Sequence, residues 1–440
     1  MSEDAVLAEL AAASPAARPA TEADAVAGVV PRYAASPAST GQASALLRAA
    51  ERHELSVVAR GTGSRLDWGA PPRRCDLVVD TSRLDQVVEH AAGDLVARVQ
   101  AGVSLHQLGE LVAGAGQQLA LDVAPGGNGQ RPGGTIGGTL ATGMAGPRRL
   151  RYGTPRDLVI GITVVRADGT VASSGGKVVK NVAGYDLGKL FAGSYGTLGL
   201  IVEAVFRLHP RPAVASYTTV DTAGPGPARA AVAAAAASEL VPVAVEISRA
   251  GRGRPVRVGV LLEGDRGGVA ERAAALRGLL GDGARTSAGA PDWWGRIEAT
   301  GGPGTLVRVA FWAAALPRVL AAIDTAAEAV TADPQVAGSA ASGVLYAALP
   351  ASPDPAAAAG FVTGLRAALA RGDADGRPAS APVPDSPPVL ASAVVVHAPP
   401  PVAALVDLWG PVPGLSLMRA VKDQFDPGHR MAPGRFAGGI

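Results

Sequence analysis

Cysteine is almost missing from this sequence of 440 residues, in which Cys75 is the only example. One thiol excludes an internal disulfide, a four-cysteine zinc site and an iron–sulfur cluster held by this chain alone. The histidines of the C-terminal part, His397 and His429, have no partner at metal-ligand spacing. We therefore expect no metal site.

An excess of charge of either sign is also lacking, with 40 basic and 38 acidic residues and a net charge of +2. This balance argues against a nucleic-acid binder and against a polybasic membrane binder. The most apolar stretch, residues 228–245, is mostly alanine and is interrupted by Arg229 and Pro242. It predicts a helix running into a strand rather than a membrane span. No signal peptide is recognisable in the acidic first ten residues, so we expect a cytoplasmic protein.

Lysine is scarce too, because nearly all basic residues are arginine. Three of the four lysines, Lys177, Lys180 and Lys189, fall in one short window, and the fourth is Lys422. An ammonium is compact whereas a guanidinium is a planar fork. We therefore expect residues 177–189 to require compact ammonium groups that a guanidinium cannot replace. The alternative is that the lysines cluster by chance.

The order of apolar runs and loops predicts a mixed α and β protein. Residues 1–25 are predicted as a helix with loose flanks, 104–111 as a helix capped by Ser104, and 416–425 as a closing helix. Short Val-rich runs at 56–60, 76–80, 94–100, 157–166 and 198–208 predict strands. After Pro210 the composition shifts to Ala-rich helices with a few strands, at 256–262, 305–311 and 390–397.

The first of three glycine-rich loops, residues 60–65, directly follows a predicted strand. Glycines let main-chain N–H groups point at an anion, and Thr62 and Ser64 add hydroxyl donors. Leu66 stands where a Rossmann motif requires its third glycine, and no Gly-Lys-Ser/Thr of a P-loop occurs. Taken alone, this loop is equally compatible with a tight turn that binds nothing.

The other two loops are longer. Residues 126–138 contain seven glycines, a costly arrangement unless the backbone must closely approach another group. Thr135 can cap a helix through Ala141 and so direct a helix N-terminus at a phosphate. Residues 184–201 predict a helix, a glycine turn and a buried strand. Together the loops suggest a large phosphate-containing cofactor held mostly by main chain.

The order of these motifs is similar to the FAD-binding domain of the vanillyl-alcohol oxidase/p-cresol methylhydroxylase (PCMH) superfamily. The similarity rests on Arg-Gly-x-Gly at 60–63, Pro-Gly-Gly-Thr-Ile-Gly-Gly at 132–138 and Gly-Ser-x-Gly-Thr-Leu-Gly-x-Ile at 193–201. Residues 146–149, 152–157, 180–186 and the tail at 418–435 further resemble the GlcE family, the smaller FAD-binding subunits of bacterial glycolate oxidase.

The resemblance implies an α+β fold. A two-subdomain PCMH-type FAD-binding domain is expected at 30–211, after an N-terminal helix and linker at 1–29. A smaller α+β cap for substrate or partner would span 212–400, and 401–440 would return to the FAD domain with the closing helix.

The resemblance also implies the cofactor-binding residues. The first loop would wrap the FAD pyrophosphate, the second would line the pyrophosphate and flavin side, and the third would hold the adenine end. The residues concerned are Ala59, Arg60, Gly61, Thr62, Gly63, Ser64 and Arg65; Gly129, Pro132, Gly133, Gly134, Thr135, Thr142, Gly143, Met144 and Ala145; and Tyr195, Gly196, Thr197, Leu198, Gly199 and Ile201.

Two departures from the superfamily pattern affect the expected chemistry. Ser64 stands where some members carry a flavin-tethering histidine, so FAD is expected to be non-covalent. The Gly-Asp-Gly-Asn-Leu-His motif, which supplies metal and substrate ligands in 2-hydroxy-acid dehydrogenases, is missing. The catalytic residues stay unassigned, with Arg148, Tyr152 and Lys180 as weak candidates. Arg148 belongs to a cationic cluster with Arg149, Arg151 and Arg156. The cluster could hold a substrate carboxylate or stabilise anionic reduced flavin, or it could be a solvated or partner-docking loop.

Three hypotheses for the function follow. The first is an FAD-binding subunit of a glycolate oxidase-type complex that oxidises a small 2-hydroxy acid to the 2-oxo acid. Its partners would be a larger FAD-containing subunit and an iron–sulfur subunit, and the complex could associate with the membrane. The second is a stand-alone oxidase or dehydrogenase of another alcohol or sugar. The third is a non-catalytic assembly subunit that holds FAD.

Overall fold

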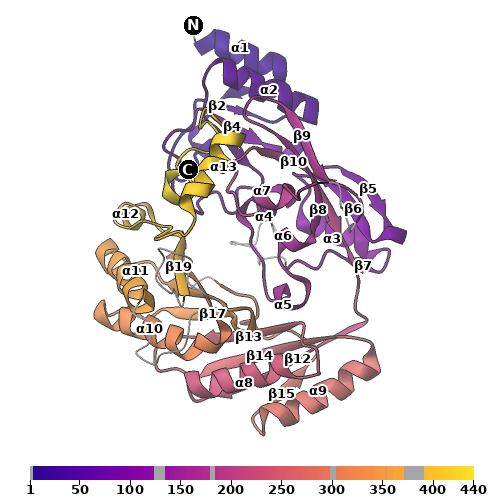
Figure 1. The fold of residues 1–440 in the computed structure, drawn as a ribbon, viewed down its shortest axis with the longest axis vertical. Helices are drawn as coiled ribbons and strands as arrows, with labels where there is room; N and C mark the ends of the chain where they lie inside the picture. The colour runs from indigo at the N-terminus through magenta and orange to yellow at the C-terminus, as the bar shows by residue number, and fades with distance from the viewer. Residues whose placement is uncertain (1–2, 123–133, 179–183, 298–303, 353, 371–390) are drawn as a thin grey trace. The chain divides into compact units, whose positions relative to one another are not determined.

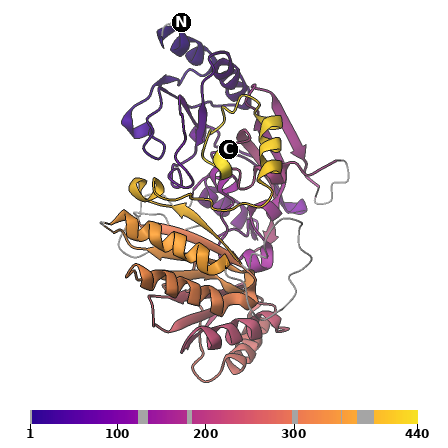
Figure 2. The same ribbon diagram turned by 60° about the vertical axis from the view of Figure 1, so that its left-hand side comes forward.

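The computed structural model describes residues 3–122, 134–178, 184–297, 304–352, 354–370 and 391–440 (Figures 1 and 2). The chain forms two compact units. The first unit combines residues 1–145, 153–211 and 414–440, and the second combines 146–152 with 212–413. Both units mix helices and strands, as the sequence predicts.

A small sheet begins the first unit. Its strand order is β1 (Arg18–Pro19), β2 (Tyr33–Ala35), β4 (Leu77–Asp80) and β3 (Val57–Arg60). Strands β2, β4 and β3 run parallel, and they bury apolar residues such as Val57 and Leu77 against α1 (Glu3–Ala13) and α2 (Thr40–Arg52). Loops that follow parallel strands gather at the carboxyl edge of a sheet, where ligands commonly bind. The loop after β3 is the first glycine-rich loop.

An antiparallel five-stranded sheet forms the second part of the first unit. Its order is β5 (Val87–Ala91), β6 (Val96–Gln100), β10 (Leu200–Arg207), β8 (Val159–Val165) and β9 (Val171–Gly175). All residues of the central strand β10 except Arg207 are buried, as its near-continuous apolarity predicts. The unit also contains α3 (Leu105–Ala113), α4 (Ile136–Thr142), α6 (Pro155–Leu158), α7 (Gly188–Phe191) and the pair β7 (Gln117–Gln118) and β11 (His209–Pro210).

The C-terminal tail belongs to the first unit, where Figure 2 shows it in yellow. Helix α13 (Leu415–Phe425) confirms the predicted closing helix, and Phe425 packs edge-on against Phe191 with ring centroids 5.5 Å apart. Beyond the helix, two main-chain hydrogen bonds join the tail to Val57 of β3. Val57 N donates to Arg430 O and Ala432 N donates to Val57 O, both at 2.8 Å. The tail therefore extends the β3 edge of the small sheet.

The second unit is built on one antiparallel sheet of eight strands. Their order is β15 (Arg285–Ser287), β12 (Val214–Thr222), β14 (Val256–Gly264), β13 (Ala244–Arg249), β17 (Gln335–Ser339), β18 (Val344–Leu349), β16 (Thr305–Phe311) and β19 (Ala391–His397). Its helices are α5 (Arg149–Tyr152), α8 (Pro225–Ala237), α9 (Arg266–Leu280), α10 (Leu316–Ala329), α11 (Pro355–Ala370) and α12 (Pro400–Ala403). The expectation of only a few strands here was wrong, because Ala-rich strands such as β18 lack a strong strand pattern.

Other expectations also differ from the structure. The N-terminal helix ends at Ala13 rather than near residue 25, and β1 and a short 3-10 helix, η1 (Glu22–Asp24), follow it. Residues 146–152 lie in the second unit, although the expected FAD-binding range of 30–211 is continuous. Among the described helices, none has both the length and the apolar character required to cross a bilayer.

Candidate cofactor-binding site

The three glycine-rich segments meet at one hollow in the first unit, which we call the loop hollow. It is lined by residues 59–66 of the first loop, by Gly134, Thr135, Gly138, Ala141 and Thr142 of the second, by Tyr195 of the third, and by Arg435 of the tail. The sequence thus predicted the meeting of the three segments. The contribution of the tail residue was not predicted.

Main-chain donors belong to the first-loop residues that line this hollow. The N–H groups of Thr62, Gly63 and Ser64 donate to no acceptor in the part of the chain that the structure describes. Adjacent main-chain N–H groups in a turn form a concave site for an anion. These groups fit the pyrophosphate of a dinucleotide cofactor, which would supply the missing acceptors.

The first loop and the second segment are in close contact. A Cβ added to Gly61 would lie 2.3 Å from Thr135 Oγ1, so only glycine fits there. Thr135 is the N-cap of α4, and its hydroxyl accepts a hydrogen bond of 3.2 Å from Gly138 N, which confirms the predicted cap. The same residue therefore starts α4 and supports the loop of unpaired N–H groups.

The third segment is attached to the other end of α4. Gly193 N donates to Leu140 O and Tyr195 N donates to Ala141 O, both at 2.8 Å. Tyr195 has a positive φ of 55° and reaches the loop hollow. Its neighbours Leu198 and Ile201 instead bury their side chains in the core of the five-stranded sheet.

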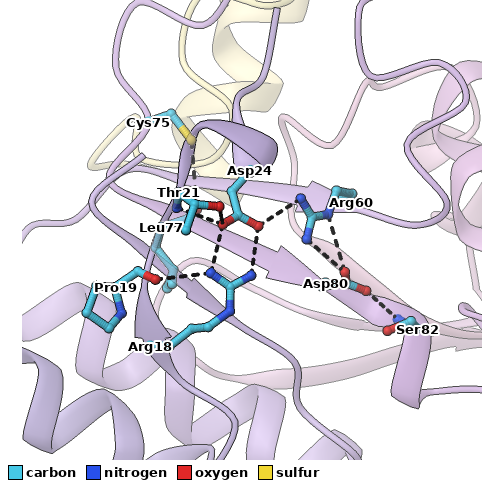
Figure 3. Close-up of polar contacts among 9 residues, drawn as sticks. All are labelled: Arg18, Pro19, Thr21, Asp24, Arg60, Cys75, Leu77, Asp80 and Ser82. Carbon is cyan, nitrogen blue, oxygen red and sulfur yellow. Dashed lines mark hydrogen bonds and ion pairs between the residues drawn. The ribbon is translucent and has the colours of Figure 1, made fainter. Parts of the chain in front are cut away.

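Arg60 is held by carboxylates on two sides, as Figure 3 shows. Its Nη2 donates to Asp80 Oδ2 at 2.9 Å, and its Nη1 donates to Asp24 Oδ1 at 3.1 Å. Asp24 also forms a bidentate pair with Arg18, at 2.8 and 2.9 Å. The Arg18 hydrogen bonds hold the pKa of the Asp24 carboxyl well below its usual range. Because two carboxylates already neutralise Arg60, its side chain anchors the loop rather than offering a free cation to a phosphate.

Asp24 was not predicted as part of the site, because the sequence places it within the expected N-terminal helix and linker at 1–29. The structure puts the neighbouring Ala23, Ala25 and Ala27 beside the first loop, on a second hollow that Asp80 also lines. A local signal was present in Thr21-x-x-Asp24, a pattern typical of a capped helix start. Thr21 N and Oγ1 both donate to Asp24 Oδ2, at 2.9 and 3.1 Å.

The remaining predicted site residues either do not line the loop hollow or lie outside the described residues. Gly143, Met144, Ala145, Gly196, Thr197 and Gly199 do not line the loop hollow, and Gly129, Pro132, Gly133 and Lys180 lie outside the described residues. Gly143 still has a structural role, because its positive φ of 63° ends α4.

Two catalytic candidates lie in the second unit. Arg148 Nε donates to Glu263 Oε1 at 3.0 Å, and the Tyr152 hydroxyl donates to Glu263 Oε2 at 3.1 Å. The Glu263 side chain is only 3% exposed, and burial raises the pKa of Tyr152. The two residues thus share one buried carboxylate, which fixes α5 to β14.

Comparison with known proteins agrees with this geometry. Residues 31–175 match the FAD binding domain family model. The chain is 36% identical to glycolate oxidase subunit GlcD of Bacillus subtilis over 199 residues, which cover 44% of this chain and 41% of that one. It is 37% identical to D-lactate dehydrogenase of Archaeoglobus fulgidus over 175 residues, covering 40% and 38%. The matched region thus spans about two fifths of the length of these relatives.

Solved structures extend the similarity in fold. An alkyldihydroxyacetonephosphate synthase superposes with a TM-score of 0.69 at 15% identity, covering 98% of this chain and 85% of that one. A 4-ethylphenol oxidase from Gulosibacter chungangensis superposes with a TM-score of 0.67 at 16% identity, covering 98% and 96%. The expected α+β fold is confirmed, and residues 31–175 are similar in sequence to the FAD binding domain family.

Proposed function

We propose that this protein is an FAD-dependent oxidoreductase that oxidises the CH–OH group of a small 2-hydroxy acid to the 2-oxo acid. The observation that carries the proposal is the loop hollow inside the matched FAD binding domain, where three N–H groups have no acceptor among the described residues. When bound, FAD would supply the hydride acceptor. The substrate class follows the names of the relatives, which include D-lactate and D-2-hydroxyglutarate dehydrogenases.

The residues of the first unit would bind and orient the cofactor. Thr62, Gly63 and Ser64 would hold the pyrophosphate through main-chain N–H groups. Thr135 contacts the loop at Gly61 and so holds it beside α4. Arg60, at the start of the loop, is held by hydrogen bonds to Asp24 and Asp80. FAD would be bound without a covalent link to the protein. Cys75 is buried and burial raises the pKa of its thiol to about 12, so it is a poor nucleophile.

The finer assignment is the smaller, GlcE-type subunit of a cytoplasmic glycolate oxidase complex, associated with the membrane through that complex. Its support is the motif pattern at 146–157 and 180–186 and a glycolate oxidase subunit among the relatives. A larger FAD-containing subunit and an iron–sulfur subunit would be the partners. The single cysteine supports the need for an iron–sulfur partner, since one thiolate cannot hold a cluster.

An absorbance spectrum of the purified chain, before and after anaerobic addition of glycolate, tests the proposal. A flavin band that bleaches with glycolate would place the substrate step in this chain. A band that bleaches only after the larger subunit is added would favour electron transfer between the subunits. No flavin band, even after incubation with FAD, would contradict the cofactor assignment.

A further inference from the structure

Arg435 is an almost fully buried cation at the loop hollow. It is only 4% exposed, and it lies in the tail, 369 residues from the carbonyl of Leu66, which it contacts. Its Nη2 donates to Leu66 O at 2.7 Å and to Trp68 O at 2.6 Å. The guanidinium therefore lies directly against the end of the first glycine-rich loop.

This guanidinium lacks a counter-ion among the described residues. Within the described part of the chain, its buried Nε has no hydrogen-bond partner and no carboxylate lies within ion-pairing distance. Burial lowers the pKa of Arg435 below its usual value. By contrast, the buried cations Lys422 and Arg249 each pair with a carboxylate, at 2.6 Å in both cases. A buried charge without such a pair is unfavourable, so the site calls for an anion from outside the chain.

The tail holds this cation in a fixed place. Arg73 N donates to Pro433 O at 2.8 Å, and Ala70 N donates to Arg435 O at 3.3 Å. Gly434, with a positive φ of 89°, leaves no room for a side chain, because a Cβ there would lie 2.6 Å from Arg73 Cγ. Only part of the side chain's donor capacity is used by Leu66 and Trp68, which leaves donors for a ligand in the hollow.

We propose that Arg435 binds the anionic diphosphate of FAD, so that the C-terminal tail completes the cofactor site. The inference rests on the function proposed above and identifies the charge that this function requires. The loop of Thr62, Gly63 and Ser64 offers neutral donors, and Arg60 is already neutralised by Asp24 and Asp80. Arg65 also lines the hollow, where it lies over the Trp68 ring, and Arg435 adds a second positive charge, which is buried and held by the tail. A charge-assisted hydrogen bond of this kind is stronger than a neutral one.

Binding of FAD and of ADP to the apoprotein tests the proposal, because ADP contains the diphosphate without the flavin. We expect Arg435→Met to weaken both ligands by a similar factor, about ten- to a hundred-fold. Arg435→Lys keeps the charge and should recover part of the loss. The matched control is Arg430→Met, which removes a buried tail guanidinium that instead contacts Ala167 O and Glu51. The control should leave both dissociation constants within about twofold.

A wild-type protein that binds neither FAD nor ADP would refute the proposed function itself. If the wild type binds FAD and Arg435→Met binds it equally well, the inference about Arg435 is wrong. Loss of FAD affinity with unchanged ADP affinity would also overturn it, since the cation would then face the flavin. If Arg435→Met does not fold, Arg435→Gln decides by the same criteria, because its amide can still donate to the Leu66 or Trp68 carbonyl.

Discussion

Lys422 and Asp426 form an ion pair that is completely buried in the first unit. Their Nζ and Oδ2 atoms are 2.6 Å apart, and neither residue is exposed. The ammonium also donates to Thr197 O at 2.7 Å and to Met431 O at 2.9 Å. The carboxylate accepts from the main-chain N–H of Met431 at 2.7 Å. One pair thus joins α13, the third glycine-rich segment and the tail that carries Arg435.

This geometry explains why lysine persists in an arginine-rich chain. The three donors of an ammonium diverge from one nitrogen and match three acceptors that surround Lys422. Lys189 uses the same property, since its Nζ donates to Arg156 O at 2.5 Å and to Val159 O at 2.6 Å. The expectation of a compact cation is therefore met at Lys189, although the role there is structural.

Replacing Lys422 with methionine should strongly destabilise the first unit. The change leaves the Asp426 carboxylate buried without its counter-ion, at a cost of about 3–5 kcal/mol in the free energy of unfolding. Denaturant unfolding monitored by circular dichroism measures the loss. Lys177→Met, which removes only an exposed pair with Glu89, is the control and should change stability by about 0.5 kcal/mol or less. Equal effects of the two variants would contradict the assigned role of the buried pair.

Asp24 should make folding sensitive to acid. Because the Arg18 hydrogen bonds lower the pKa of Asp24 from its ordinary value of 3.8, the unfolded chain takes up this proton before the folded protein does. The stabilisation is complete at neutral pH and is lost as the pH falls below about 5. The wild type should lose about 1.4 kcal/mol more per pH unit than Asp24→Asn in the steepest part of this range. The measurement is the free energy of unfolding between pH 7 and pH 3.

An exposed carboxylate provides the control for the acid series. Asp282→Asn removes the same charge on the surface of the second unit, so its pH profile should follow that of the wild type. Superimposable profiles for wild type and Asp24→Asn would show that the lowered pKa does not stabilise the fold.

The local features of the cofactor site could be predicted from the sequence, whereas its charge pairs could not. Gly61 and Thr135 are recognisable because turn and cap chemistry depends on neighbouring residues. The Arg435 contact with Leu66 and the Arg148 pair with Glu263 join residues 369 and 115 positions apart. Nothing in the local pattern of one arginine indicates which distant carbonyl or carboxylate it will meet.

The contact between Gly61 and Thr135 predicts a compensating pair of substitutions. Gly61→Ala places a methyl group 2.3 Å from Thr135 Oγ1, so the first loop must move. Overpacking of this kind costs about 1–3 kcal/mol in unfolding free energy, and FAD affinity should fall as the N–H groups shift. In Gly61→Ala/Thr135→Ala the nearest side-chain atom is Thr135 Cβ at 3.2 Å, so part of the FAD affinity should return. Titration of the apoproteins with FAD measures this recovery.

A matched glycine tests whether this effect is specific. Gly93 has no heavy atom within 4 Å of an added Cβ and no positive φ, so Gly93→Ala should bind FAD as the wild type does. A double variant no better than Gly61→Ala would mean that the loss arises from the backbone of residue 61 rather than from Thr135.

Substitution of Glu263 together with Arg148 distinguishes a structural from a catalytic role for Arg148 and Tyr152. Arg148→Gln removes the charged partner of a carboxylate that is only 3% exposed, so the second unit should lose about 1.5–3 kcal/mol of unfolding free energy. In Arg148→Gln/Glu263→Gln the uncompensated charge is gone, and most of this stability should return. If the role of Arg148 and Tyr152 is only to compensate the buried Glu263 carboxylate, the double variant should also regain the wild-type rate of flavin reduction by the substrate. A double variant that is stable but reduces the flavin slowly would instead show that Arg148 acts on the substrate itself.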